Sequence, residues 1–115
     1  MRVRTDFWVK AYLRRRFGEG LAGGVTRHGD DMAGAIYIKI NRLDGTVALF
    51  GPAPQSLDAE DLERRWAPAH KAQFVPEAEA DATLARASEF DSDLWVIEIE
   101  DRAGRHGLEG WLAEG

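Results

Sequence analysis

Two alternating apolar segments, joined by a glycine turn, constrain the fold of this chain more than any other feature. Residues 35–41 read AIYIKIN, with the isoleucines on one face, and residues 46–51 read TVALFG. The intervening RLDG carries the Asp-Gly signature of a tight antiparallel connection. Gly45 can adopt a positive φ there without the penalty that a Cβ would bring. The pattern predicts a β-hairpin, extended by a short strand near residues 24–27.

Helical patterns lie on both sides of this hairpin. Apolar residues recur at helical spacing over residues 6–17, and Asp6 or Thr5 is the expected N-cap. The glycines of GEGLAG then end the helix. These glycines match the G-x-G-x-x-G pattern of dinucleotide-binding proteins, but we reject that function because they follow a helix, whereas in those proteins they lead into one. Residues 76–90 begin with a proline and several acidic residues, which favour a helix N-terminus.

The segment LWVIEIE, residues 94–100, predicts the last strand. One of its faces is apolar throughout, and the other becomes acidic at Glu98 and Glu100. This pattern is typical of a half-buried antiparallel strand that runs out toward solvent, so we expect both glutamates to face water.

Residues 57–74 fit two structures. LDAEDLERRW predicts a short helix capped by Asp58, whereas RRWAPAHKAQF predicts an edge strand, where Pro68 is tolerated. The elements together predict an α+β fold: an antiparallel sheet of four or five strands, an N-terminal helix and a second helix before the last strand. The length of 115 residues predicts a single domain over residues 1–115.

Composition narrows the classes of function. The chain has no cysteine, which excludes disulfides, thiolate nucleophiles and thiolate metal sites. No secretory signal is visible and no segment approaches the roughly 20 apolar residues of a membrane span, so we expect a cytoplasmic protein without a membrane contact. The net charge of −5 divides into +5 over residues 1–29 and −10 over the remainder. The acidic body disfavours nucleic acid as a general partner.

An acidic cluster surrounds the last strand, and it consists of Asp91, Asp93, Glu98, Glu100 and Asp101. Carboxylates with a bound metal can polarise a phosphate or carbonyl group, which gives the alternative of a metal-binding protein or hydrolase. Such a site needs three or more converging ligands, and the three histidines of the chain have no ligand-spaced partners. We favour hydrated surface carboxylates. No catalytic residue, metal or cofactor is assigned, and enzymatic activity is left undecided.

Three consecutive arginines, Arg14, Arg15 and Arg16, lie in the N-terminal helix. Successive helical residues are rotated by about 100°, so these side chains do not form one basic stripe. They are candidates for weak anion or nucleic-acid binding, and the alternatives are a solvated face or salt bridges to the acidic body.

The C-terminal segment, residues 107–115, carries Trp111 and Leu112. A tryptophan left in water loses the stabilisation that burial gives, so we expect this apolar tail to be covered. It is either flexible and docks onto a partner or a second copy, or it folds back on the core. Folding back is the alternative that we favour.

Three blocks carry a resemblance to a known family: FWVKAYLRR, GAIYIKINRLDGTVALFGPAPQ and FDSDLWVIEIEDRAGR. Over residues 6–106 the chain resembles domain-of-unknown-function family 1491, whose members are small alphaproteobacterial proteins. The resemblance implies a compact stand-alone domain in the bacterial cytoplasm, and it implies no activity, substrate or cofactor. The segregation of charge and the lack of an assembled catalytic motif make a non-enzymatic protein-interaction or adaptor module the leading hypothesis, with a partner surface that includes the basic helix or the apolar tail.

Overall fold

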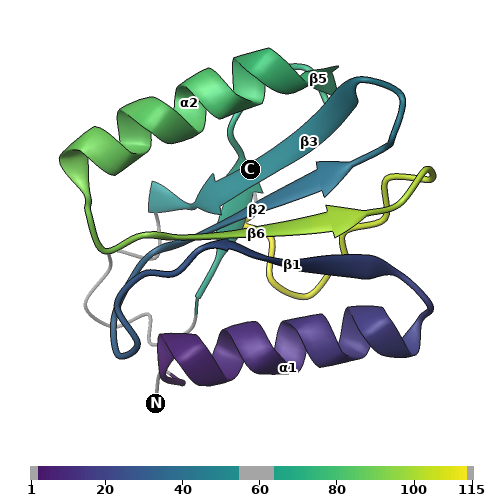
Figure 1. Cartoon of the computed structure of the whole chain (residues 1–115). Coiled ribbons are helices and arrows are strands. Elements are labelled where there is room, and N and C mark those ends of the chain that lie inside the picture. Colours follow the sequence, from purple (N-terminus) through teal and green to yellow (C-terminus); the bar gives the residue numbers. More distant parts are fainter. Residues whose placement is uncertain (1–2, 55–63, 114–115) are drawn as a thin grey trace.

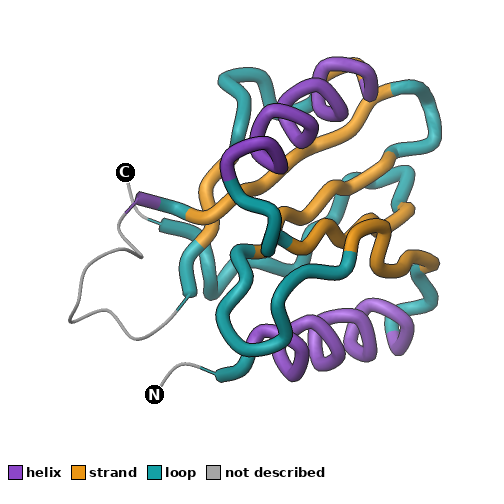
Figure 2. Tube along the Cα trace, turned by 60° about the vertical axis from the view of Figure 1, so that its left-hand side comes forward, coloured by secondary structure: helices purple, strands orange, loops and turns teal. Residues whose placement is uncertain are grey.

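Two helices cover opposite faces of one mixed β-sheet (Figures 1 and 2). The computed structural model describes residues 3–54 and 64–113. Within them the elements are α1 (Thr5–Gly18), β1 (Ala22–Arg27), β2 (Ile36–Asn41), β3 (Thr46–Pro52), β4 (Trp66–Pro68), β5 (Val75–Pro76), α2 (Glu77–Phe90) and β6 (Trp95–Glu100). The predicted α+β fold, with one helix at the N-terminus and one before the last strand, is confirmed.

The sheet has six strands among the described residues, in the order β1-β6-β2-β3-β4, with β5 beside β3. It is mixed, whereas the sequence predicted an antiparallel sheet of four or five strands. Strand β6 runs antiparallel to β1 and parallel to β2. Parallel neighbours need a crossover of about a dozen residues or more, and the 14-residue α2 supplies it. The last strand therefore lies in the interior of the sheet.

The predicted hairpin is formed by β2 and β3, with Ile38 opposite Phe50 and Ile40 opposite Ala48. Gly45 has the expected positive φ of 90°. The sequence did not predict the positive φ of Leu43, which is 64°. The preceding Asn41 stabilises this conformation, because its side-chain carbonyl accepts the Leu43 N–H at 2.8 Å.

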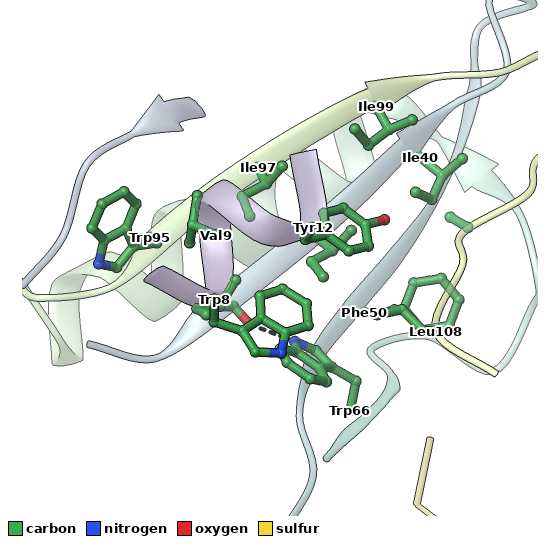
Figure 3. Packing of buried hydrophobic residues seen from close by; sticks show 13 residues of the cluster. Trp8, Val9, Tyr12, Ile40, Phe50, Trp66, Trp95, Ile97, Ile99 and Leu108 are labelled. Atoms are coloured by element: carbon green, nitrogen blue, oxygen red, sulfur yellow. Dashed lines mark hydrogen bonds between the residues drawn. The ribbon is translucent and has the colours of Figure 1, made fainter. Parts of the chain in front are cut away.

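The main core fills the space between α1 and the sheet (Figure 3). The Trp8 ring stacks on Tyr12, with centroids 5.2 Å apart, and packs against Trp66 at 4.4 Å. The indole N–H of Trp66 donates to the Ile36 carbonyl at 2.9 Å, so the buried polar atom is satisfied. The isoleucines and tryptophan of the central strands are buried beneath α1: Ile36, Ile38, Ile40, Trp95, Ile97 and Ile99.

A smaller apolar cluster lies under α2, on the opposite face of the sheet. It contains Val47 and Leu49 of β3, Val75 of β5 and Ala80 of α2. Leu84 packs against its edge. The apolar face of α2 is therefore thin, and it leaves room on this face of the sheet for charged side chains.

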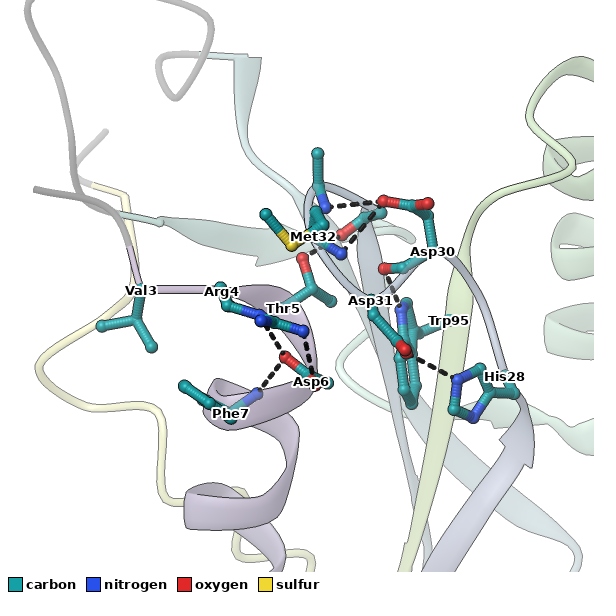
Figure 4. A network of polar contacts seen from close by, with 12 residues as sticks. Val3, Arg4, Thr5, Asp6, Phe7, His28, Asp30, Asp31, Met32 and Trp95 are labelled. Carbon is teal, nitrogen blue, oxygen red and sulfur yellow. Dashed lines mark hydrogen bonds and ion pairs between the residues drawn. The ribbon is translucent and has the colours of Figure 1, made fainter.

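The N-terminus of α1 differs from the prediction, because neither Asp6 nor Thr5 is the N-cap. Arg4 occupies that position, and its side chain makes no capping hydrogen bond to the helix backbone. The hydroxyl of Thr5 is fully buried and donates to the Gly34 carbonyl at 3.0 Å. The Asp6 carboxylate pairs with Arg4 and accepts the N–H of Phe7 (Figure 4). Contacts with the loop before β2 thus anchor the helix end, and the local sequence could not reveal them.

The predicted helix capped by Asp58 lies largely outside the described residues. Residues 66–68 form the edge strand β4, with Pro68 opposite Phe50 of β3. On the other side of β4, Leu112 forms a parallel bridge with Trp66. The C-terminal segment therefore extends the edge of the sheet.

Candidate functional site

The acidic residues around β6 do not converge. Within residues 3–54 and 64–113, no group of three or more His, Asp or Glu side chains is arranged to hold a metal ion. The Asp91 carboxylate accepts the N–H of Asp93 in a local turn, and Asp93 and Glu100 are exposed. The expected position of Glu100, facing water, is confirmed.

Glu98 differs from the prediction, because it lies in a polar cluster on the α2 face of the sheet. Its carboxylate accepts a hydrogen bond from Asn41 at 3.1 Å and lies 3.6 Å from Nζ of Lys39. The Lys39 side chain is buried, and it also donates to Glu77 at 2.7 Å and to Asp81 at 2.9 Å. One ammonium group thus neutralises part of the charge of three carboxylates.

The pKa of Lys39 reflects two opposing effects. Burial lowers the pKa, but the hydrogen bonds to Glu77 and Asp81, together with the negative charge of Glu98, outweigh burial and raise it. Lys39 therefore stays charged and holds α2 against β2 and β6. Lys39 was not among the sequence candidates, although its place between isoleucines on an alternating strand marked it as lying on the other face.

Asp101 stabilises the turn after β6. The residue is buried, and its carboxylate accepts hydrogen bonds from the N–H groups of Ala103 and Arg105 and from Nε of Arg105 at 2.7 Å. The side-chain hydrogen bond from Arg105 is the largest cause of a lowered Asp101 pKa. The roles that the structure gives Asp91, Glu98 and Asp101 are those of turn and ion-pair residues.

The three arginines of α1 fall into two environments. Arg16 is 2% exposed, and its guanidinium donates to the His106 carbonyl at 3.0 Å and to Glu19 at 3.1 Å. Arg14 and Arg15 are exposed and make no ion pair with any residue that the structure describes. Arg16 lies four residues after the buried Tyr12, on the core side of α1, where its guanidinium reaches the His106 carbonyl.

Residues 107–113 of the C-terminal segment are folded back, as the sequence favoured. The N–H of Trp66 donates to the Trp111 carbonyl at 2.8 Å, and the N–H of Ala113 donates to the Trp66 carbonyl at 2.9 Å. Leu108 is fully buried in the main core. The Trp111 ring meets Trp8 edge-on at 5.7 Å.

His106 and Gly107, where the C-terminal segment begins, are tightly packed against α1. The hydroxyl of Tyr12 donates to the His106 carbonyl at 2.6 Å. Burial raises the pKa of Tyr12 to about 12, although the charge and hydrogen bond of Arg16 oppose the shift. Gly107 has a φ of +69°, and a Cβ there would lie only 1.0 Å from Nη1 of Arg16. Any other residue here would strain the backbone and displace the guanidinium group of Arg16.

An open groove runs between α1 and the folded-back tail, and it is the strongest candidate site of the described residues. Its volume is about 570 Å³. Apolar side chains supply most of its lining, and Arg14 and Arg15 add two exposed guanidinium groups. The apolar contributors are Val3, Phe7, Trp8, Ala11 and Trp111.

Phe7 and Ala11 were missed at the sequence level. Phe7 is 54% exposed on the outer side of α1, whereas the neighbouring Trp8 is buried. The available signal was helical spacing: Trp8, Val9 and Tyr12 lie on one side of the helix, and Phe7 and Ala11, four residues apart, lie together on another. Of the predicted binding residues, Arg14, Arg15, Arg16 and Trp111 all line the groove, and Leu112 lies beside β4 instead.

Comparison with known proteins identifies the family. The model of the family described as "Protein of unknown function (DUF1491)" matches residues 3–109. The chain belongs to this family. No curated protein matches the chain. Within the described residues, no helix has the length and apolar character needed to cross a membrane.

Solved DUF1491 structures share the fold. The crystal structure of a family protein from Caulobacter crescentus is 38% identical, with a TM-score of 0.79 over 99% of this chain and 100% of that one. The solution structure of Atu0922 from A. tumefaciens is 43% identical, with a TM-score of 0.75 over 87% and 86% of the two chains. A Caulobacter family structure determined by NMR is 41% identical, with a TM-score of 0.74 over 99% and 96%.

Proposed function

We propose that this chain is a non-enzymatic protein-interaction module that binds its partner in the groove between α1 and the tail. The observation that carries the proposal is the groove itself, which combines an apolar lining with two exposed arginines that form no ion pair with the described residues. A monomeric protein gains stability by covering such a surface, so an exposed apolar hollow of this kind is typical of a binding site.

The positions of the charged residues support this function over the alternatives. Of the carboxylates that would form a hydrolase or metal site, Asp91, Glu98 and Asp101 are bound instead to a backbone N–H, Lys39 and Arg105. The other two, Asp93 and Glu100, are exposed. A nucleic-acid site through the basic helix would have two exposed arginines in place of three, because Arg16 is buried. The net charge of −5 opposes a long polyanion such as nucleic acid, whose phosphates would extend well beyond these two arginines.

A site-specific photo-cross-linking experiment tests the proposal. The photoreactive amino acid p-benzoylphenylalanine replaces Phe7 in the groove, in an alphaproteobacterial host. The same substitution at Phe90 is the matched control, because that phenylalanine is 92% exposed and belongs to α2 on the other face of the sheet. We expect a discrete protein adduct from position 7 that position 90 does not give.

The adduct must also depend on the groove. We expect it to disappear when Arg14 and Arg15 are both replaced by glutamate. The protein identified in the adduct should then bind the purified chain in isothermal titration calorimetry, and the same double substitution should abolish the heat signal. Equal adducts from positions 7 and 90, or a stable Phe7 derivative that gives no adduct, would refute the proposed function.

A further inference from the structure

Building on the proposed function, we infer that the occupant of the groove is an acidic amphipathic helix of another protein, which inserts a bulky apolar side chain between α1 and Trp111. Three properties of the described residues lead to this class of partner: the linear arrangement of the α1 side chains, the size of the apolar hollow, and the charge at one end of it.

The α1 wall of the groove is a stripe along the helix. Phe7, Ala11 and Arg15 are spaced four residues apart, so they lie one above another on the same side of α1. The stripe is about 12 Å long, as the rise of 1.5 Å per residue requires. The small Ala11 lies at its centre, where a partner backbone can approach closely. A partner helix packed along such a stripe would contact it over about two turns.

The hollow has room for a large anchor. A volume of about 570 Å³ lies within the range of ligand pockets. Its lining includes the buried Trp8 and Tyr12 and the partly exposed Trp111. Leucine, phenylalanine or tryptophan side chains are the usual anchors of helices bound in grooves of this kind.

The charge of the groove selects an acidic partner. Arg14 and Arg15 bring two positive charges to the end of the stripe, and Lys10 is exposed one turn before Arg14. Arg14 and Arg15 have no carboxylate partner among the described residues. Carboxylates of a bound helix would pair with these guanidinium groups, which suit bidentate contacts.

A second copy of the chain is the competing occupant with the best chemistry. Phe90 is 92% exposed and lies between Glu89 and Asp91, so it combines an aromatic side chain with acidic neighbours. It lies at the end of α2, however, and the residue one turn before it is the small, partly buried Ala87, so Phe90 has no second bulky apolar neighbour that could contact the stripe. A separate helical partner therefore fits the groove better.

A displayed library of random 16-residue helical peptides tests the inference with the purified chain as bait. We expect the enriched peptides to be net negative and to carry leucine, phenylalanine or tryptophan at positions three or four residues apart. Arg14→Glu should weaken their binding by about fivefold or more in fluorescence anisotropy, because it replaces an attraction by a repulsion. Arg102→Glu, an equal charge change at an exposed residue after β6, should leave binding unchanged.

The outcomes that overturn the inference are distinct from those that overturn the proposed function. Enriched peptides that are neutral or basic, yet compete for the groove, would refute the acidic helix and leave the interaction module intact. Sedimentation equilibrium showing dimers that Phe90→Ser abolishes would assign the groove to a second copy. Binding to phosphatidylglycerol vesicles that Arg14→Glu abolishes would assign it to a membrane surface. No enriched peptide together with no photoadduct at Phe7 would refute both.

Discussion

Replacing Gly107 by alanine should test how the tail is held against α1. Gly107 has a φ of +69°, and a Cβ there would lie 1.0 Å from Nη1, 2.1 Å from Cζ and 2.7 Å from Nη2 of Arg16. The guanidinium cannot stay in place, and it loses its hydrogen bonds to the His106 carbonyl and to Glu19.

The cost has two parts. The left-handed backbone conformation costs alanine about 1 kcal/mol. Displacing Arg16 removes the hydrogen bond from its buried guanidinium to the His106 carbonyl, which is worth about 2 kcal/mol. The bond to Glu19 adds little, because the Glu19 side chain is 49% exposed. We therefore expect Gly107→Ala to lower the free energy of unfolding by about 3 kcal/mol.

Urea unfolding followed by tryptophan fluorescence measures this loss. Gly110→Ala is the matched control, because no heavy atom lies within 4 Å of the position of its Cβ, and it should change stability by less than about 0.5 kcal/mol. In an Arg16→Ala background the cost of Gly107→Ala should fall to about 1 kcal/mol, because the clash is gone. Equal costs in both backgrounds would show that Arg16 does not occupy the space above Gly107.

Three further predictions concern the buried polar groups. Lys39→Met should lower the free energy of unfolding in urea by about 2 kcal/mol, and by less in high salt, because it leaves three carboxylates without their cation. Lys10→Met, at an exposed residue, is the control. A Lys39→Met protein with unchanged stability would refute the ion-pair cluster. Since the Asp101 pKa is lowered in the folded state, its stabilisation is present above the unfolded-state pKa and disappears as the pH falls through the folded-state value. The stability difference between the native protein and Asp101→Asn should therefore narrow in acid, and a constant difference would contradict this. The folded-state pKa of Tyr12 is raised from 10.0 to about 12, so the contribution of Tyr12 to the free energy of unfolding is complete below pH 10 and is lost as the pH rises toward 12. Tyr12→Phe should therefore flatten the decline in stability at alkaline pH. Tyrosinate absorbance that rises fully near pH 10 in the folded protein would refute this prediction.

The parts of the fold that the sequence predicted are those with local causes. The hairpin follows from alternation in residues 36–41 and from the positive φ that Gly45 tolerates. The start of α2 follows from the acidic residues after Pro76, which oppose the helix dipole. In both cases the residues that decide the structure are neighbours in the chain.

The neighbours of β6 could not be predicted in the same way. Its alternation showed which face is apolar, and that face is indeed buried under α1. Alternation is identical for parallel and antiparallel pairing, so it could not reveal that β6 lies between β1 and β2. Lys39 lies directly opposite Glu98 in the parallel register. Glu98, which the sequence predicted to face water, therefore belongs to an ion-pair cluster.

The groove is also a product of contacts between distant residues. Trp111 and Trp8 come from the two ends of the chain and meet only after the tail pairs with β4. The sequence marked the arginines and the tail as separate binding candidates. It contained no local signal that Arg14, Arg15 and Trp111 line one groove, or that Arg16 packs behind them against the His106 carbonyl.

The groove exists in this form only if residues 108–113 stay docked on β4 and α1. Amide hydrogen exchange measured by NMR tests this directly, because the N–H of Ala113 is bound to the Trp66 carbonyl and the N–H of Trp66 to the Trp111 carbonyl. We expect both amides to be protected, together with a nuclear Overhauser effect between the rings of Trp8 and Trp111. An Ala113 amide that exchanges as fast as in an unstructured peptide, with no contact between the two indoles, would contradict the existence of the groove.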